Sequence, residues 1–354
     1  MDIRAVREDE IEETFELQRM VFRPDEGAGA LERYRTYVRD DPGYRMDQSR
    51  VLLADGRIVA HLRVWDRAIR VRGSVLRAGG IGSVLTHPDH RGRGYARALM
   101  RNAEAYMLEA GYDVGLLFTI IGTPFYRALG WTPIPLPTFV IELESEAGAR
   151  PSTHVTALDV DRDLDAVMAI YERCTGCLTG PETRPRDYWR AGPSRIRGVF
   201  PEWGVAVDSE LLGYATFDAS ADGIWVKEGC AETSGDGALT GMAQFIFGCA
   251  RRYGLERIEG SLPAGHGLVS ALEAVCGSDA SWGCHDEMML KGINWRTIRE
   301  KLNGEPRDGP PEDEGAFWRA LYGQGAAETD ASESGWMASL PKCEGPFYWW
   351  SDIF

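Results

Sequence analysis

The sequence lacks any uninterrupted run of the roughly 18 apolar residues that a membrane-spanning helix needs, so no span is predicted. Positive charge is scarce, because 39 Lys and Arg residues stand against 54 Asp and Glu residues and the net charge is −15. A protein that binds nucleic acid through its phosphates needs clustered Lys and Arg, so this balance argues against such a partner. It fits a cationic substrate or a charged, soluble surface. Residues 1–4 open an acidic stretch and provide no apolar run, so a signal peptide is not expected.

Metal-binding and disulfide patterns are also missing. The six His residues show no H-x-x-x-H or H-E-x-x-H spacing, so no metal is expected. The seven Cys residues are odd in number and scattered, which favours a reduced, cytoplasmic setting. Cys174 and Cys177 form one C-x-x-C, but no second pair follows at similar spacing and the motif ends a predicted helix. Two ordinary thiols are therefore the preferred interpretation.

What the sequence does contain is typical of a folded chain of two or three domains, with 354 residues, 44% of them hydrophobic and 26% charged. The patterns in residues 1–143 predict strands and helices in the order β-α-α-β-β-β-α-β-α-β. Within this part, Asp55-Gly56 separates two apolar runs and predicts a tight hairpin between strands at 51–54 and 58–65. Residues 1–143 are therefore expected to form a complete mixed α/β domain.

A second, weaker copy of this pattern follows. Residues 144–153 are small, polar and charged, and are interpreted as a linker. Residues 154–291 again place a long helix, at 238–253, before a short strand, as the helix at 94–110 does in the first domain. The remaining residues, 292–354, contain a Pro- and Gly-rich loop and end in an aromatic cluster that is expected to dock against the rest of the chain.

The most informative segment is 84–96, V-L-T-H-P-D-H-R-G-R-G-Y-A, where a strand end, a Gly-rich loop and a helix start follow one another. The backbone N–H groups of such a loop and the dipole of the helix converge on one anion. Gly92 and Gly94 remove side chains and let a diphosphate approach, while Arg91 and Arg93 offer charge-assisted hydrogen bonds. The alternative is a Gly-rich turn with solvent-exposed arginines. Neither the G-x-G-x-x-G fingerprint of dinucleotide sites nor the G-K-[ST] of triphosphate sites is present.

This segment resembles the acyl-CoA pyrophosphate loop of the GNAT superfamily of N-acetyltransferases, since Arg91-x-x-Gly94-x-Ala96 follows a V-x-T-H-P strand end. The resemblance implies an α+β fold of tandem GNAT-like domains, with acetyl-CoA as acyl donor and no metal. It also implies a bulged strand that separates from its neighbour and pairs its backbone, at Val84 and Thr86, with pantetheine. The cofactor-binding residues that it implies are Val84, Leu85, Thr86, Arg91, Gly92, Arg93, Gly94, Tyr95, Ala96, Arg97, Ile121 and Gly122.

A second match lies at 125–131, F-Y-R-A-L-G-W, which resembles the F-Y-x-x-x-G-[FW] motif of the same superfamily. In that family the Tyr hydroxyl lies near the CoA sulfur. The resemblance therefore implies that Tyr126 is catalytic and donates a proton to the departing thiolate. The alternative is a core tyrosine whose hydroxyl has a structural partner.

The order of the parts is similar to that of enhanced-intracellular-survival (Eis) proteins, which join a catalytic GNAT domain, a GNAT-like domain without the cofactor loop and a sterol-carrier-like segment. Residues 235–238, G-D-G-A, stand where the second loop would be, and Asp236 and Glu232 would repel a diphosphate, so one cofactor site per chain is predicted. Residues 292–354 would be a shortened sterol-carrier-like segment. The resemblance implies that the terminal carboxylate, here of Phe354, acts as catalytic base; water or a nearby acid is the alternative.

The function implied is an acetyl-CoA-dependent N-acetyltransferase that acts directly on a primary amine of a small cationic or lysine-like acceptor. The alternatives are a tandem GNAT enzyme with another acyl-CoA or amine, and a CoA-binding sensor without turnover. A cytoplasmic location is expected, and a homo-oligomer is compatible with the resemblance.

An acidic group falls in or after the first two predicted helices and consists of Asp25, Glu26, Asp40 and Asp41. It is interpreted as a solvated acidic face, with binding of a cationic amine as the alternative. Trp65 is interpreted as either a pocket wall or a core residue.

Overall fold

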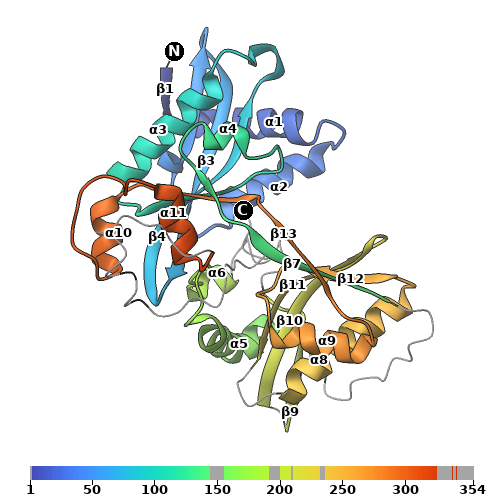
Figure 1. Ribbon diagram of the computed structural model, residues 1–354. Coiled ribbons are helices and arrows are strands. Elements are labelled where there is room, and N and C mark those ends of the chain that lie inside the picture. The colour runs from blue at the N-terminus through green and yellow to red at the C-terminus, as the bar shows by residue number, and fades with distance from the viewer. Residues whose placement is uncertain are drawn as a thin grey trace.

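The chain folds into two lobes, each built on a mixed β-sheet (Figure 1). The computed structural model describes residues 2–143, 155–190, 200–208, 210–231, 236–324, 337 and 340. In spatial order the first sheet contains β1 (Asp2–Ala5), β2 (Ser49–Ala54), β3 (Arg57–Val71), β4 (Ser74–Thr86), β5 (Val114–Phe118), β14 (Met288–Gly292) and β6 (Thr132–Pro133). The second sheet contains β13 (Ser281–His285), β7 (Leu136–Glu142), β12 (Arg257–Gly260), β11 (Gly223–Ala231), β10 (Glu210–Ser220), β9 (Trp203–Val207) and β8 (Val155–Ala157).

The two sheets share one plan. In each, neighbouring strands are antiparallel except for a single parallel pair, which is β4 with β5 in the first sheet and β11 with β12 in the second. A parallel pair needs a crossover helix. α3 (Tyr95–Glu109) provides it in the first sheet, and α8 (Asp236–Arg252) in the second. The predicted mixed α/β class is therefore confirmed, and both sheets place a long helix before the parallel strand, as the expected repeat does.

Helices cover both faces of the first sheet. On β5 and β14, Leu117 and Met289 pack in the cluster that includes α3, whereas Leu116 and Leu290 point the other way. That second face is covered by helices from near the end of the described chain. The helices of this half are α1 (Ile11–Phe22), α2 (Ala28–Arg39), α3, α4 (Pro124–Arg127), α10 (Trp295–Lys301) and α11 (Glu314–Leu321). The second sheet carries α5 (Val160–Thr175), α6 (Arg186–Arg190), α8 and α9 (Gly267–Cys276).

The two halves of the chain exchange one strand each, which the sequence did not predict. After β6 the chain leaves the first sheet and β7 joins the second, while after β13 it returns and β14 joins the first. The two crossings run side by side, and the Ile134 N–H donates to the Met288 carbonyl at 2.9 Å between them (Figure 1). The sheets thus divide the chain differently from the expected boundaries at residues 143 and 291.

The described part of the C-terminal segment packs on the first sheet. Trp295 and Ile298 of α10 and Phe317 and Trp318 of α11 are buried in one cluster with residues of β4, β5 and β14. The sterol-carrier-like character of this segment stays a prediction. The linker at 144–153 and Phe354 lie outside the described residues, as does most of the degenerate loop before Asp236.

Candidate active site

The first sheet opens between β4 and β5. The two strands pair in parallel from Ala78 with Val114 to Ile81 with Leu117, and β5 then ends at Phe118 while β4 continues to Thr86. Past Ile81, the β5-facing edge of β4 pairs with no other strand in the described ranges. The sheet therefore presents a free strand edge at the place where the resemblance implies one.

A bulge in β4 accompanies this separation. The β3–β4 register shifts between His61 and Arg63, and opposite it Ser83 adopts a φ of +53°, a left-handed conformation that a side chain rarely takes. An extra residue of this kind turns the strand and leaves ladder groups unpaired. The bulge lies just before Val84, so it re-aims the strand segment that the resemblance assigns to pantetheine.

A cleft of about 420 Å³ lies at this opening. Nine of the predicted site residues line it: Val84, Leu85, Thr86, Arg91, Gly92, Tyr95, Ala96, Ile121 and Tyr126. The structure thus brings together residues from the end of β4, the Gly-rich loop, the first turn of α3 and α4. Arg93, Gly94, Arg97 and Gly122 are not among the residues that line it.

Sequence reasoning missed four residues of the cleft. Val21 and Phe22 come from the end of α1, and His90 and Phe125 adjoin predicted site residues. Phe22 is 46% exposed, so the cleft has an apolar rim that is open to solvent. The helical period of α1 marks a buried face but carries no signal for a residue at the end of the helix that stays exposed.

The loop has the conformation that its glycines predict. Gly92 and Gly94 have φ values of +76° and +78°, and a Cβ at either position would meet no atom within 4 Å. The glycines are therefore required by the backbone and leave open space in front of it. Gly94 is the N-cap of α3, so the free N–H groups of that helix face the loop. Arg91 and Arg93 make no ion pair with any described residue, which leaves their charges for an anion.

Tyr126 is a buried residue in the wall of the cleft. It lies in α4, its carbonyl accepts the Trp131 N–H at 3.1 Å, and its ring packs edge-on against Phe125 with centroids 4.9 Å apart. The side chain is 6% exposed, and burial raises the pKa of its hydroxyl to about 12. The phenol is therefore protonated throughout the neutral range and has a proton to donate.

Asp41 corrects the expectation of a solvated acidic face. Asp25 and Glu26 are exposed, but the Asp41 carboxylate is 1% exposed and pairs with the buried guanidinium of Arg63. The same guanidinium lies 3.4 Å from the ring centroid of Trp65, which is itself buried. Both side chains thus belong to a buried stack rather than to the wall of the cleft.

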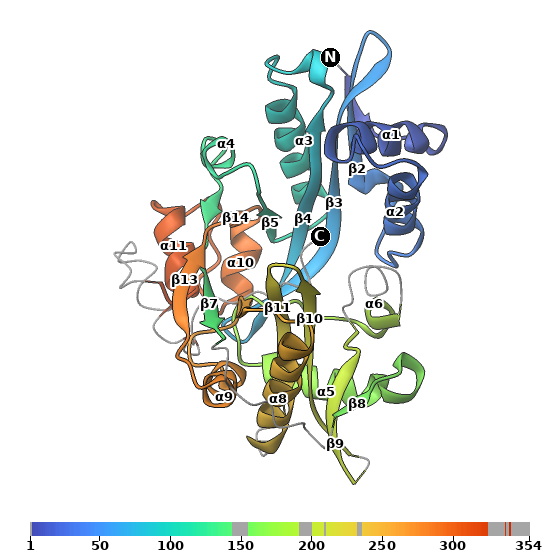
Figure 2. The same ribbon diagram turned by 90° about the vertical axis from the view of Figure 1, so that its right-hand side faces the viewer.

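A second, larger cavity of about 830 Å³ lies between the two lobes. Its walls come from the last residues of β3, the first residues of β4 and the segment 182–188 of the second half, and it shares no lining residue with the first cleft. Figure 2 shows β3 and β4 reaching from the first lobe toward α6. Both acidic and basic side chains line this cavity, and several of them pair with each other, as Arg77 does with Asp66 at 2.9 Å.

The two mixed sheets and the cleft at the free edge of β4 can be compared with known proteins. Residues 2–134 match the model of the acetyltransferase (GNAT) domain. This part of the chain therefore matches a GNAT acetyltransferase domain, in agreement with the class of enzyme expected from residues 84–96 and 125–131.

One curated relative is the aminoglycoside 2'-N-acetyltransferase of Mycolicibacterium fortuitum, 33% identical over 88 residues. The match covers 25% of this chain and 45% of that protein, so the chain spans less than half of the relative's length.

Solved structures resemble the whole chain in fold. GCN5-related N-acetyltransferases from Kribbella flavida and Anabaena variabilis match all of both chains, with 15% and 14% identity and TM-scores of 0.68 and 0.72. Eis1 from Mycobacterium abscessus also matches over all of both chains, with 17% identity and a TM-score of 0.62. At these identities the likeness concerns the fold alone.

No described helix is long and apolar enough to cross a bilayer. Within the same ranges no group of three or more His, Cys, Asp or Glu side chains is arranged to hold a metal ion.

Proposed function

We propose that the chain is an acetyl-CoA-dependent N-acetyltransferase that acts on a primary amine of a small cationic or lysine-like acceptor. The observation that carries this proposal is the single cleft that joins the free edge of β4, the Gly-rich loop at the start of α3 and the Tyr126 hydroxyl. The net charge of −15 favours a cationic acceptor, and the relative from M. fortuitum is by name an acetyltransferase of aminoglycosides.

The residues of the cleft fit acetyl-CoA as the acyl donor. The diphosphate would lie over Gly92 and Gly94, against the N-terminus of α3, with Arg91 and Arg93 beside it. The pantetheine arm would run along the free edge of β4 past Val84 and Thr86. Leu85, Tyr95, Ala96 and Ile121 supply further parts of the wall, and Arg97 and Gly122 lie next to it in the sequence.

The reaction that this arrangement supports is direct transfer. The neutral amine attacks the thioester carbonyl carbon, the C–N bond forms and the C–S bond breaks. Backbone N–H groups of the bulged strand polarise the carbonyl oxygen. Tyr126 gives its proton to the departing sulfur, and a base removes the extra proton from the amine. No covalent acyl-enzyme is needed.

The proposals for the catalytic base and for the oligomeric state come from the sequence alone. The terminal carboxylate of Phe354 stays the predicted base, with water or a nearby acid as the alternative. Removal of Phe354 should lower the rate more at neutral pH than at high pH, because a deprotonated amine needs no base. An equal loss at both would indicate a packing role. One cofactor site per chain, a cytoplasmic location and a homo-oligomer likewise stay predictions.

The experiment is release of free thiol from acetyl-CoA, measured with a panel of polyamines, aminoglycosides and lysine peptides. We expect release that depends on one class of amine. Release only from a longer acyl-CoA would favour the transferase with another donor. Saturable CoA binding without thiol release for any donor and amine would instead favour the sensor.

A further inference from the structure

The second sheet has an edge that corresponds to the cleft of the first. β11 runs parallel to β12 as β4 does to β5, and α9 follows β12 as α4 follows β5. At this edge Cys230 stands near the end of β11, His266 caps the N-terminus of α9, and Cys174 lies in the last turn of α5. Gly229 permits the approach, because a Cβ there would lie 2.6 Å from Leu268 Cδ2.

The Cys174 side chain interacts with each of the other two. The Cys174 sulfur makes hydrogen bonds with Cys230 and His266, and it accepts another from the backbone of Ala231. The Nδ1 atom of His266 already accepts the backbone N–H of Leu268 at 3.2 Å. Nδ1 is therefore already occupied as an acceptor, which leaves Nε2 as the imidazole nitrogen available to the Cys174 sulfur.

These contacts make the two sulfurs chemically unequal. Hydrogen bonds from Cys230 and His266 lower the pKa of Cys174 to about 5, so that Cys174 is a thiolate at neutral pH. Burial holds the pKa of Cys230 well above its ordinary value, and Cys230 is fully buried. Cys174 is partly exposed. A reachable thiolate beside a protonated, sheltered thiol is the arrangement found at redox-sensitive cysteines.

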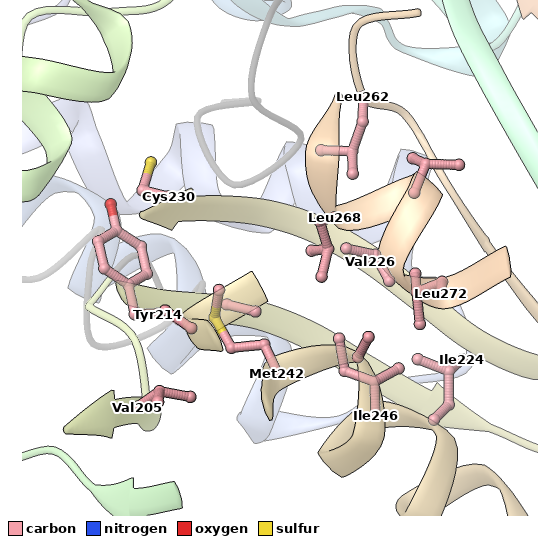
Figure 3. Close-up of a cluster of buried hydrophobic side chains, with 14 of the residues drawn as sticks. Val205, Tyr214, Ile224, Val226, Cys230, Met242, Ile246, Leu262, Leu268 and Leu272 are labelled. Atoms are coloured by element: carbon pink, nitrogen blue, oxygen red, sulfur yellow. The ribbon is translucent and has the colours of Figure 1, made fainter. Parts of the chain in front are cut away.

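A buried polar network fixes the strand beneath this pair. The Tyr214 hydroxyl donates to Glu228 at 2.6 Å, and the guanidinium of Arg184 donates to the same carboxylate at 2.7 and 3.1 Å. Figure 3 shows the Tyr214 hydroxyl and the Cys230 sulfur pointing the same way at one end of the apolar cluster. Because Arg184 compensates the charge of Glu228, a thiolate at Cys174 does not face a bare carboxylate.

We propose that Cys174 and Cys230 form a reversible disulfide when the protein meets hydrogen peroxide. The Cys174 thiolate attacks one peroxide oxygen, the O–O bond breaks, Cys174 becomes a sulfenic acid, and the released hydroxide takes a proton from solvent. The Cys230 sulfur then attacks the Cys174 sulfur, the S–O bond breaks, and the leaving hydroxide takes the Cys230 proton. Two thiols lose two electrons, peroxide is reduced to two waters, and a thiol reductant reverses the change.

The site lies beside the segment that joins the lobes. A few residues after Cys174, the Gly180 N–H donates to the Arg70 carbonyl at 2.8 Å, and the Arg70 N–H donates to the Pro181 carbonyl at 2.9 Å. This segment thus extends the edge of β3 in the first sheet. A disulfide at Cys174 would tie the end of α5 to β11 directly before this contact.

The experiment treats the reduced full chain with hydrogen peroxide and maps its disulfides by peptide mass spectrometry. We expect one main product, a peptide pair linked between Cys174 and Cys230, which a thiol reductant removes. A link between Cys174 and Cys177, or oxidation of Cys177 and Cys284 without any Cys174–Cys230 pair, would overturn the proposal. The mapping uses the unaltered chain, so its outcome does not depend on whether a variant folds.

Three variants then separate the two steps. Cys174→Ser should abolish the linked peptide, and Cys230→Ser should leave a sulfenic acid at Cys174 that a 1,3-dione traps. Cys177→Ser is the matched control, since Cys177 is exposed and three residues away, and it should form the linked peptide as the unaltered chain does. A linked peptide in Cys174→Ser, or its loss in Cys177→Ser, would contradict the assignment.

Discussion

The ion pair between Arg63 and Asp41 provides a quantitative test of the first lobe. The two side chains are 4% and 1% exposed, and burial lowers the pKa of Arg63 to about 10, so it remains charged at neutral pH. Arg63→Met keeps the volume and removes the charge. The Asp41 carboxylate would keep the Gly43 N–H, at 2.9 Å, but no cation. Breaking a buried pair from one side costs about 3–5 kcal/mol.

The assay is thermal unfolding followed by calorimetry. A loss of that size corresponds to a drop in Tm of roughly 10 °C for a unit of about 150–250 residues. Arg39→Met is the control, because Arg39 pairs with Glu32 and Asp40 on the surface and is 60% exposed, so no measurable shift is expected. Adding Asp41→Asn to Arg63→Met should recover most of the loss. Equal shifts for the two single Arg variants would refute the reasoning.

Three further outcomes follow from the structure. Gly115→Ala should lower stability by about 1–3 kcal/mol in urea unfolding, because its Cβ would lie 2.5 Å from Trp131 Cη2; an unchanged midpoint would contradict this packing. The Arg4 guanidinium lowers the pKa of Glu10 from 4.5 to about 2, so its contribution is present above pH 4.5, and the Tm difference between wild type and Arg4→Gln should vanish as the pH falls to about 2. Burial raises the pKa of Tyr126 from 10.0 to about 12, so its hydroxyl keeps the proton that it donates up to pH 10.0. The ratio of wild-type turnover to Tyr126→Phe turnover should therefore stay constant up to that pH. A decline of this ratio at lower pH would mean that the pKa of the hydroxyl is not raised.

Local patterns in the sequence were sufficient to predict the hairpin turn at 55–56, the Gly-rich loop and the helix that follows it. Asp55 and Gly56 take the left-handed φ values, +52° and +76°, of the predicted hairpin turn. The strand–loop–helix reading of residues 84–96 also holds, since β4 ends at Thr86 and α3 begins at Tyr95. In each case a few neighbouring residues determine the backbone, so their order alone is informative.

Contacts between distant residues could not be predicted in this way. The period of apolar residues marks β7 and β14 as strands but does not say which sheet each joins. β11 was missed, because Lys227 and Glu228 interrupt its apolar run; Lys227 pairs with Asp218, and Glu228 is buried with Arg184. The C-x-x-C motif likewise pairs Cys174 with its sequence neighbour Cys177. The hydrogen-bond partner of Cys174 is instead Cys230, which is 56 residues away in the sequence.

The most direct test of the proposed reaction separates turnover from binding at Tyr126. Thiol release from acetyl-CoA at saturating amine, and CoA affinity by calorimetry, would be measured for wild type, Tyr126→Phe and a control, Tyr253→Phe, whose ring is 64% exposed in the second lobe. Loss of a general acid costs about a hundredfold or more in turnover. We predict that loss for Tyr126→Phe alone, with CoA affinity nearly unchanged. Unchanged turnover in Tyr126→Phe would contradict the role of its hydroxyl in the reaction.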